Sequence, residues 1–448
     1  MHLWELVYYC VIGGSIITYL AGLRLFRLPL LTFSSVNYFL AVLLAMLPGY
    51  AVSNGVYLPS QLGRGFDQTI YFIYVCYAVT LTGAALLGQI TAKKFTLAGK
   101  ARAGFNLRLG IMVAFIVFYA CAYFHWVPEV PLKNLLFGTS QAGDAAEQRI
   151  SITHQLGGLG SELPWVFRFW RGIIQNWPVA VCFILAYKKA TGGKISSVLY
   201  YPCVLGTAWL LTFTLEKASL VEFVFGLAVI PMMVKRKTQY IRLAASVGVV
   251  TLLSMACIAV FIRPETSGVF KALTNRLNGQ TSSIYVQIQH VREQGYLGLR
   301  GIKFPFESWI LGKDYYISLS TEAYAAIFPE MARAGYVGSA GGLSLAELYF
   351  AFGWFGLPIF VLLVGILSWM DIVWRNSITL SSRGEGFRCI NGAFYVLGMT
   401  LYSLTYVGSL FMIVSFPFGL SAECLLIAIL YFWLIKASSL RLVALGRT

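Results

Sequence analysis

Two long apolar stretches decide the fold class of this chain. Residues 241–262 have the sequence IRLAASVGVVTLLSMACIAVFI, and residues 408–435 have the sequence GSLFMIVSFPFGLSAECLLIAILYFWLI. A helix needs about 20 mostly apolar residues to cross the hydrocarbon core of a bilayer, whereas the strands of a membrane barrel are short and alternating. Continuous runs of this length therefore predict transmembrane helices.

The composition of the whole chain agrees with these two stretches. Of its 448 residues 58% are hydrophobic and only 12% are charged, against about 25% charged in soluble domains. This excludes an ordinary soluble enzyme. The eight cysteines fall in apolar segments without paired spacing, so we expect neither disulfides nor thiolate metal sites. The chain has no Walker-type phosphate loop, which argues against ATP-driven work.

Apolar runs and their breaks predict an all-α polytopic membrane protein with about eleven transmembrane helices in a single integral membrane domain, 1–448. The first run is too long and too weakly basic at its start for a cleaved signal, so we expect it to stay in the mature protein. The expected spans are 3–23, 30–52, 69–91, 109–127, 172–187, 196–215, 218–234, 243–262, 343–370, 389–408 and 411–435.

The basic residues predict the orientation of these spans. Short loops that keep Lys and Arg face the cytoplasm, and one alternate set of loops here holds most of the 34 Lys and Arg. This set includes the segments around 93–108, 188–194 and 436–447. The amino terminus is therefore expected outside and the carboxyl terminus inside, and the +16 net charge indicates contact with anionic lipid headgroups rather than nucleic acid.

Two long loops, 128–171 and 263–342, are expected on the outer face. The second indicates a small subdomain with two helices. The first helix is expected at about 282–294, with a buried apolar face and a stop at Gly295, and the second at about 320–334, with a stop at Gly335.

The larger loop also concentrates cations beside an expected membrane surface. Arginine offers a planar set of donors that matches phosphate oxygens, so some of these side chains are candidates for an anion site. Surface salt bridges with neighbouring acids are the alternative explanation for most of them. The candidate pyrophosphate-binding residues are Arg263, Arg276, Arg292 and Arg300.

Lys217 lies in a very short outward connection between two apolar runs, in the sequence Leu215-Glu216-Lys217. Ionisable groups at membrane depth are costly unless they are paired or line a wet cavity, which makes them functional candidates. Lys217 is therefore a candidate electrophile for a lipid phosphate. A Glu216–Lys217 pair that caps the hairpin is the alternative.

Glu347 is the next candidate, because it begins a predicted helix at the outer mouth of the ninth span. Ser344 and Glu347 match the S-x-x-E capping box, which by itself would explain both residues. A carboxylate in this place, after Gly341 and Gly342, is also suited to act as a base near a closely approaching ligand.

His290 is the third catalytic candidate and lies on the predicted helix 282–294. A histidine there is suited to shuttle a proton, although a solvated helix face is the alternative. No metal-binding spacing of histidines occurs in the chain, so a metal site is not expected.

These features together resemble the Wzy-type polymerases of bacterial surface polysaccharides, which are related to the O-antigen ligases. The resemblance rests on Lys217 in a tight outward hairpin, on the Arg-rich outward loop, and on the Gly-Gly-x-Ser-x-x-Glu sequence before Gly353-Trp354-Phe355-Gly356. It implies a GT-C-like membrane glycosyltransferase of the bacterial inner membrane. Such an enzyme polymerises undecaprenyl-pyrophosphate-linked oligosaccharide repeat units at the periplasmic face.

The resemblance also implies the roles of individual residues. Lys217 matches the basic residue of the hairpin, Glu347 matches the acidic residue before the aromatic segment, and ligases of the wider group use a histidine in the large loop, where His290 is the candidate. No metal or other cofactor is implied. Membrane lipids and a chain-length regulator are the implied partners. An O-antigen-type ligase and a flippase of the lipid-linked unit remain the alternatives.

Overall fold

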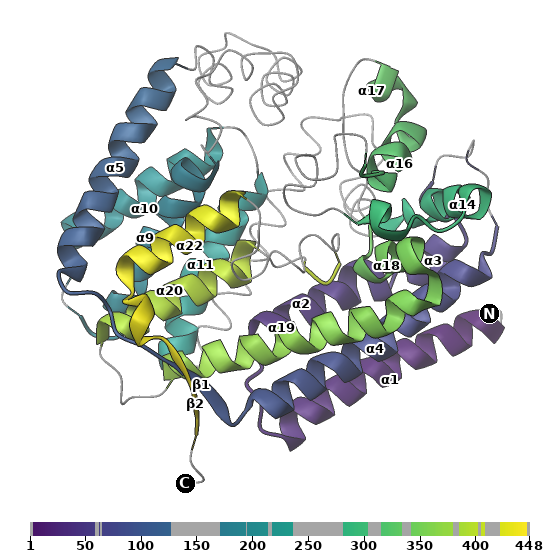
Figure 1. The fold of residues 1–448 in the computed structure, drawn as a ribbon, viewed down its shortest axis with the longest axis horizontal. Helices are drawn as coiled ribbons and strands as arrows, with labels where there is room; N and C mark the ends of the chain where they lie inside the picture. Colours follow the sequence, from purple (N-terminus) through teal and green to yellow (C-terminus); the bar gives the residue numbers. More distant parts are fainter. Residues whose placement is uncertain are drawn as a thin grey trace.

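The computed structural model shows a helical molecule in which two groups of helices lie side by side (Figure 1). The groups meet where α19 packs on α20. The structure describes residues 3–58, 62, 65–126, 171–193, 195–213, 217–235, 281–302, 315–333, 342–379, 385–401, 405–407 and 422–445.

The first group is built around the contact between its two longest helices, α4 and α19. Gly88 of α4 lies directly against the backbone of Gly365 in α19, so that a Cβ at residue 88 would overlap the carbonyl oxygen of residue 365. Small residues of this kind let membrane helices approach closely. The members of the group are α1 (Leu3–Leu25), α2 (Phe33–Ala41), the π-helical turn η1 (Val42–Met46), α3 (Gly49–Ser53), α4 (Gln68–Ala92) and α19 (Gly356–Thr379).

Buried tyrosines connect the helices of this group through their hydroxyl groups. Tyr8 of α1 donates to the carbonyl oxygen of Met46 at 2.6 Å, and Tyr77 of α4 donates to that of Tyr406 at 2.7 Å. Tyr38 of α2 shares a hydrogen bond with Thr82 of α4. Each of these rings fills apolar space while its hydroxyl finds a partner, as a buried tyrosine requires.

The second group packs aromatic rings against glycines. Gly392 of α20 leaves the space that the Tyr187 ring of α9 occupies, and Gly226 of α11 does the same for the Phe183 ring. Both rings are buried. The members are α5 (Phe105–Trp126), the π-helical turn η4 (Arg171–Asn176), α9 (Trp177–Ala190), α10 (Ser197–Thr212), α11 (Lys217–Lys235), α20 (Glu385–Leu401) and α22 (Ala422–Leu434).

The expected span 343–370 is two helices joined by a bend. Helix α18 (Ser344–Phe352) ends at Gly353, whose φ of 62° lies in the left-handed region that favours glycine. After the 3-10 turn η7 (Gly353–Phe355), α19 runs to Thr379. The helix therefore ends nine residues later than expected, and this extension takes in Asp371 and Arg375.

The capping-box interpretation of Ser344 and Glu347 is wrong. The residue that caps α18 is Leu343, and no side chain makes a capping hydrogen bond there. Ser344 is already inside the helix, and its hydroxyl donates to the carbonyl oxygen of Tyr406 at 2.9 Å. The Ser344 hydroxyl, which a capping box would use for a local hydrogen bond, therefore binds a residue that is distant in the sequence.

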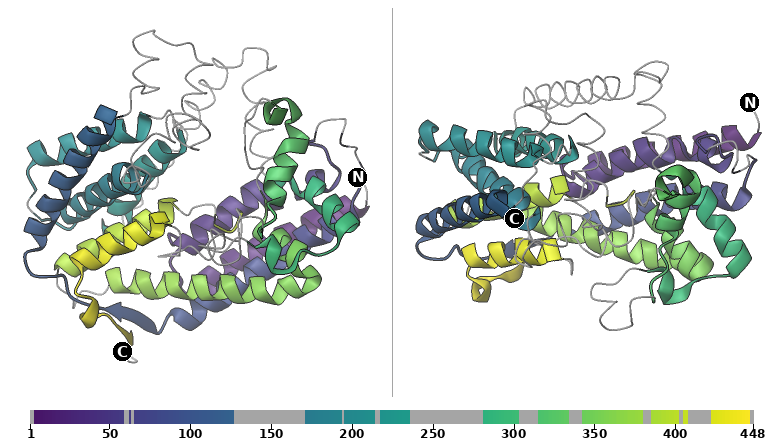
Figure 2. Two further views of the ribbon diagram at one scale, coloured as in Figure 1. Left: turned by 45° about the horizontal axis from the view of Figure 1, so that its top comes forward. Right: turned by 90° about the horizontal axis from the view of Figure 1, so that it is seen from above.

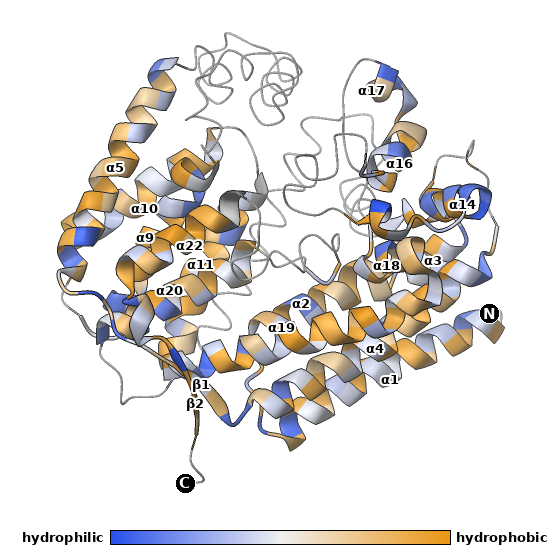
Figure 3. Cartoon of the chain, viewed as in Figure 1, coloured by the Kyte–Doolittle hydropathy of each residue, from blue (hydrophilic) through white to orange (hydrophobic). Residues whose placement is uncertain are grey.

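Five helical stretches among the described residues are long and apolar enough to cross a membrane. All five coincide with expected spans, which supports the all-α membrane class. Figure 3 shows the apolar belts along α1, α4, α5 and α19, with hydrophilic residues at α14, α16 and α17. The expected span 243–262 lies outside the described residues, and the number eleven remains a prediction. The five stretches are Leu3–Leu25, Phe33–Ser53, Gln68–Ala92, Phe105–Trp126 and Ser344–Thr379.

Several basic loops meet at one end of the molecule. Strand β1 (Phe95–Ala98) pairs antiparallel with β2 (Arg441–Ala444), which joins the loop after α4 to the carboxyl-terminal segment. Lys93 donates through Nζ to the carbonyl oxygen of Phe26, and Asn376 donates to that of Phe95. These segments belong to the set that the charge pattern assigns to one side of the membrane. Figure 2 shows the amino terminus at the opposite end of α1 from this region.

The carboxylate of Asp371 fixes the start of α2 inside the protein. Asp371 is fully buried, and its Oδ2 accepts the backbone N–H of Ser34 at 2.9 Å while its Oδ1 accepts that of Phe33 at 3.3 Å. Tyr395 of α20 donates to Oδ1 at 2.6 Å. The first N–H groups of a helix lack partners within the helix and carry partial positive charge. One carboxylate therefore satisfies α2 and joins it to α19 and α20.

We predict that Asp371→Ala lowers the free energy of unfolding by about 2–4 kcal/mol, because it leaves buried N–H donors without an acceptor. Asp371→Asn, which keeps one acceptor oxygen, is expected to lose less. The measurement is thermal unfolding of the purified protein in detergent micelles. The control is Glu330→Ala, whose side chain is 88% exposed. Equal unfolding temperatures for Asp371→Ala and the control would contradict the capping role.

Candidate catalytic site

Helix α14 (Ile284–Gln294) carries His290 and Arg292 and confirms the helix expected at about 282–294. Its apolar face, Ile284, Ile288 and Val291, is buried as its spacing requires. The helix ends at Gly295, whose φ is 82°. It contacts α4, α16 and α18. Figure 1 shows that it lies at the end of the molecule opposite the basic loops.

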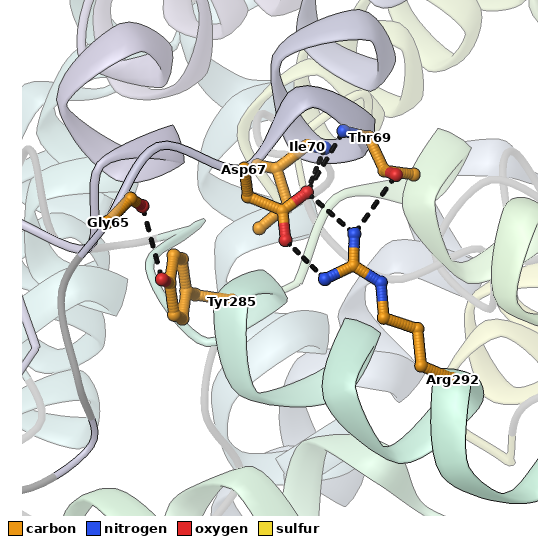
Figure 4. Close-up of polar contacts among 6 residues, drawn as sticks. All are labelled: Gly65, Asp67, Thr69, Ile70, Tyr285 and Arg292. Carbon is orange, nitrogen blue, oxygen red and sulfur yellow. Dashed lines mark hydrogen bonds and ion pairs between the residues drawn. The ribbon is translucent and has the colours of Figure 1, made fainter.

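An ion pair holds α14 on the start of α4 (Figure 4). Arg292 donates from Nη1 to Oδ2 of Asp67 at 2.7 Å and from Nη2 to Oδ1 at 2.9 Å. The same Oδ1 accepts the backbone N–H groups of Thr69 and Ile70, so Asp67 is also the N-cap of α4. A two-donor arginine pair of this geometry fixes orientation as well as distance. Arg292 is therefore engaged in positioning α14.

Two further hydrogen bonds from tyrosine hydroxyls fix the amino-terminal half of α14. Tyr285 donates to the carbonyl oxygen of Gly65 at 3.1 Å (Figure 4). Tyr74 of α4 donates to the hydroxyl of Thr281 at 2.6 Å, just before α14 begins. With the ion pair, these contacts tie both ends of α14 to the segment around the start of α4. The side chains on the remaining face of α14 consequently stand on a rigid support.

The second helix of the loop is shorter than expected. Helix α16 (Leu319–Ile327) ends before Phe328, and α17 (Pro329–Arg333) follows, so the expected helix 320–334 is broken. Pro329 explains the break, because proline has no N–H to donate and disfavours helical geometry in the residue before it. Gly335, the expected stop, lies outside the described residues.

His290 faces α16 and pairs with a carboxylate there. Its Nδ1 is 2.9 Å from Oε2 of Glu322. The expected alternative, a solvated helix face, is wrong, because the His290 side chain is mostly buried at 19% exposure. An ionised carboxylate only accepts hydrogen bonds, so Nδ1 carries the proton toward Glu322.

The other ring nitrogen of His290 is left unpaired inside the protein. Nε2 is buried and has no hydrogen-bond partner, and the same holds for Oε1 of Gln287 one turn earlier. Both residues line a cavity of about 250 Å³ between α14 and α16, together with Glu322. Sites for drug-sized ligands occupy about 300–1,000 Å³. This cavity therefore suits one small group of a substrate rather than a whole oligosaccharide.

The arrangement has the form of a general base. A carboxylate on Nδ1 fixes the ring and its tautomer, which leaves the Nε2 lone pair to accept a proton from a hydroxyl. The pair also stabilises the imidazolium ion that forms after the transfer. No group of three or more potential metal ligands occurs among the described residues.

Of the other three predicted anion-binding arginines, the structure describes only Arg300. Arg300 lies exposed on the 3-10 turn η6 (Gly298–Gly301) close after α14, and its Nε donates to the carbonyl oxygen of Tyr315 at 3.3 Å. Arg263 and Arg276 lie outside the described residues. Of the four predicted anion-binding arginines, the structure thus brings Arg292 and Arg300 to the same region.

Glu347 lies on α18, whereas Lys217 lies on α11 of the second helix group. Glu347 is in the first turn of α18, half-buried, and α18 packs against α14. A Cβ at Gly342 would be only 3.3 Å from Oε1 of Glu347, so the glycine lets the backbone pass close to the carboxylate. Lys217 begins α11, which packs with α9, α10 and α20. The position of its side chain is not described.

Sequence reasoning missed Asp67 and Glu322, the two acids that organise the site. The sequence Asp67-Gln68-Thr69 directly before an apolar run is a helix-start signal, so the N-cap was detectable. Nothing local joins Asp67 to Arg292 or Glu322 to His290, because these pairs form only when distant segments fold together.

Comparison of the chain with models of protein families, with curated proteins and with solved structures finds no match.

We predict that the Asp67–Arg292 pair has two separable contributions. Asp67→Asn keeps an acceptor for the α4 N-cap and loses the ion pair, whereas Asp67→Ala loses both. The N-cap contributes about 1 kcal/mol and the pair about 1 kcal/mol at its half-exposed position. Thermal unfolding of Asp67→Asn, Asp67→Ala, Arg292→Gln and their combinations measures this. If the double variant Asp67→Asn/Arg292→Gln loses as much as the two single losses added together, the two side chains are not coupled.

Proposed function

We propose that this protein is a membrane glycosyltransferase that polymerises lipid-pyrophosphate-linked oligosaccharide repeat units. The observation that carries the proposal is the His290–Glu322 pair beside a cavity, with a free ring nitrogen, in an extramembrane helix pair of a polytopic helical protein. The orientation assigned from the basic loops puts this pair on the periplasmic face of a bacterial inner membrane. The resemblance to Wzy-type polymerases supplies the substrate class.

The chemistry requires a base and an anion site but no nucleotide. The acceptor sugar hydroxyl attacks the carbon that bears the pyrophosphate, and His290 Nε2 takes the hydroxyl proton. The new bond to the acceptor oxygen forms while the bond to the pyrophosphate oxygen breaks, and lipid pyrophosphate leaves with the electron pair. This direct displacement inverts the configuration at that carbon.

Cations near the base stabilise the leaving group in this proposal. Arg300 is exposed next to α14, and Lys217, Arg263 and Arg276 remain predicted contributors to the pyrophosphate site. Positive groups placed where charge develops stabilise the transition state. Arg292 is assigned a positioning role instead, because its guanidinium is bonded to Asp67. Glu347 is retained as a second candidate base from the resemblance.

A ligase that transfers finished polymer is the second candidate. It uses the same donor chemistry, and the specific observation in its favour is that the paired histidine lies in the large outward loop, where the related ligases use a histidine. The acceptor distinguishes the two functions. A polymerase extends the lipid-linked unit itself, whereas a ligase needs a different acceptor.

A flippase is less well supported, although one ionisable residue, Asp371, is fully buried in α19. Its oxygens accept the first N–H groups of α2 and the Tyr395 hydroxyl. This structural role explains Asp371 without a transport pathway.

We predict that His290→Ala reduces polymer formation by about 10²-fold or more, since a positioned base contributes 10²–10⁴-fold. Glu322→Gln is expected to lower the turnover rate by about tenfold with little effect on the substrate concentration at half-maximal rate, because Glu322 acts through His290. The assay is gel analysis of products from purified protein and the lipid-linked repeat unit alone.

The matched control for Glu322→Gln is Glu330→Gln on the adjacent α17, where the side chain is exposed. Lys217→Ala and Glu347→Ala belong in the same assay, at equal protein abundance. Wild-type product ladders from His290→Ala would remove the base from the proposal. A ladder that appears only when another acceptor is added identifies a ligase, and accumulation of substrate on the inner leaflet of a deletion strain identifies a flippase.

The membrane orientation gives an independent prediction. A cysteine introduced at Glu330 is expected to react with a membrane-impermeant maleimide in intact spheroplasts, whereas one introduced at Arg441 should react only after permeabilisation. The reason is that α17 lies at the end assigned to the periplasm and β2 at the end where the basic loops meet. The opposite labelling pattern would reverse the orientation and exclude periplasmic chemistry at His290.

A further inference from the structure

Arg375 is a buried cation that forms no ion pair with the residues that the structure describes. It lies in the last turns of α19 and is only 8% exposed, and neither its Nε nor its Nη1 has a hydrogen-bond partner. No ion pair involves Arg375 among the residues that the structure describes. Buried polar groups in folded proteins are almost always hydrogen-bonded, so a guanidinium in this state indicates that something else satisfies it.

The side chain cannot escape this cost by losing its proton. Arginine stays charged at any relevant pH, and an unpaired buried charge costs several kcal/mol. Asp371 lies one turn earlier on the same helix, but its two oxygens already accept from Phe33, Ser34 and Tyr395. The missing partner is therefore an anion from outside the described fold.

Two other cations, Arg388 and Lys188, lie near Arg375. The guanidinium groups of Arg375 and Arg388 both lie within electrostatic range of the Tyr187 hydroxyl, and Arg388 donates from Nε to the carbonyl oxygen of Ile378. Lys188, Arg388 and the acid Glu385 likewise lie within electrostatic range of the Cys389 thiol. Three helices, α9, α19 and α20, thus bring three cations and one exposed acid together.

The location of the cluster indicates the kind of anion. The end of α19 touches β1 through Asn376, which donates to the carbonyl oxygens of Lys93 and Phe95. The cluster therefore lies at the end of the apolar helices where the basic loops meet. In a helical membrane protein this is the level of the lipid headgroups, and basic pockets between helices there bind anionic headgroups.

We propose that Arg375 and Arg388 bind the phosphate group of an anionic phospholipid between α9, α19 and α20. The phosphate oxygens accept the unused N–H donors of Arg375, and Lys188 adds positive charge. This site is at the opposite end of the molecule from the His290–Glu322 pair and is independent of the proposed transferase activity. Its expected effect is to stabilise the contact between the two helix groups, since α19 and α20 belong to different groups.

The test is lipid-dependent thermal unfolding of the full-length protein in nanodiscs made from phosphatidylcholine alone or with added phosphatidylglycerol. The wild-type protein is expected to unfold at a higher temperature with phosphatidylglycerol. Arg375→Met should abolish this shift while unfolding no earlier than wild type in phosphatidylcholine, because it removes an unpaired buried charge. Arg388→Gln should weaken the apparent affinity for phosphatidylglycerol about tenfold, by loss of one charge-assisted contact.

Arg441→Gln is the matched control, because Arg441 is an exposed cation at the same end of the molecule. It should keep the full shift. An equal shift in Arg375→Met and wild type, or an equal loss in Arg441→Gln and Arg375→Met, would overturn the site in favour of general surface attraction. A shift that millimolar inorganic phosphate reproduces in phosphatidylcholine nanodiscs would overturn the lipid source. If Arg375→Met does not fold, Arg388→Gln and native mass spectrometry of retained phosphatidylglycerol decide the question.

Discussion

The carboxylate of Asp371 is the interaction on which the arrangement of the helices depends. It accepts the first N–H groups of α2 and the hydroxyl of Tyr395, so one side chain joins α2, α19 and α20 in the interior. In hydrocarbon a helix end has no water to satisfy it, and each unsatisfied group costs several kcal/mol. Together with Thr32, the N-cap residue of α2, this one acid fixes the start of α2 and connects it to helices of both groups.

Asp67 has a comparable role at the other end of the molecule, where one carboxylate again caps a helix and holds a second helix against it. It caps α4 and binds Arg292 with the same carboxylate, so the start of a membrane helix becomes the anchor of an extramembrane helix. The consequence is a fixed α14, and a fixed α14 holds His290 against Glu322. The candidate base is thus supported by the transmembrane bundle rather than by the loop that contains it, and preorganised groups of this kind are what catalysis requires.

The two ends of the protein have different chemistry. One end presents the His290–Glu322 pair and a small cavity, which is suited to a proton transfer at a sugar hydroxyl. The other end gathers basic loops and the buried, unpaired Arg375, which is suited to anionic headgroups. Under the proposed function, the first end carries the chemistry and the second end binds the lipids that stabilise the protein.

The sequence by itself determined the class of fold and much of its outline. Apolar runs of sufficient length fix membrane helices because hydrocarbon leaves few alternatives, and α14 with its stop at Gly295 followed from local spacing. The break between α16 and α17 also has a local cause, Pro329. Only the tertiary structure decided the true length of α19 and the partners of Ser344, His290 and Arg292. The partners were not visible, because His290–Glu322, Ser344–Tyr406 and Asp67–Arg292 join residues 32, 62 and 225 positions apart, and such contacts depend on packing that no local pattern encodes.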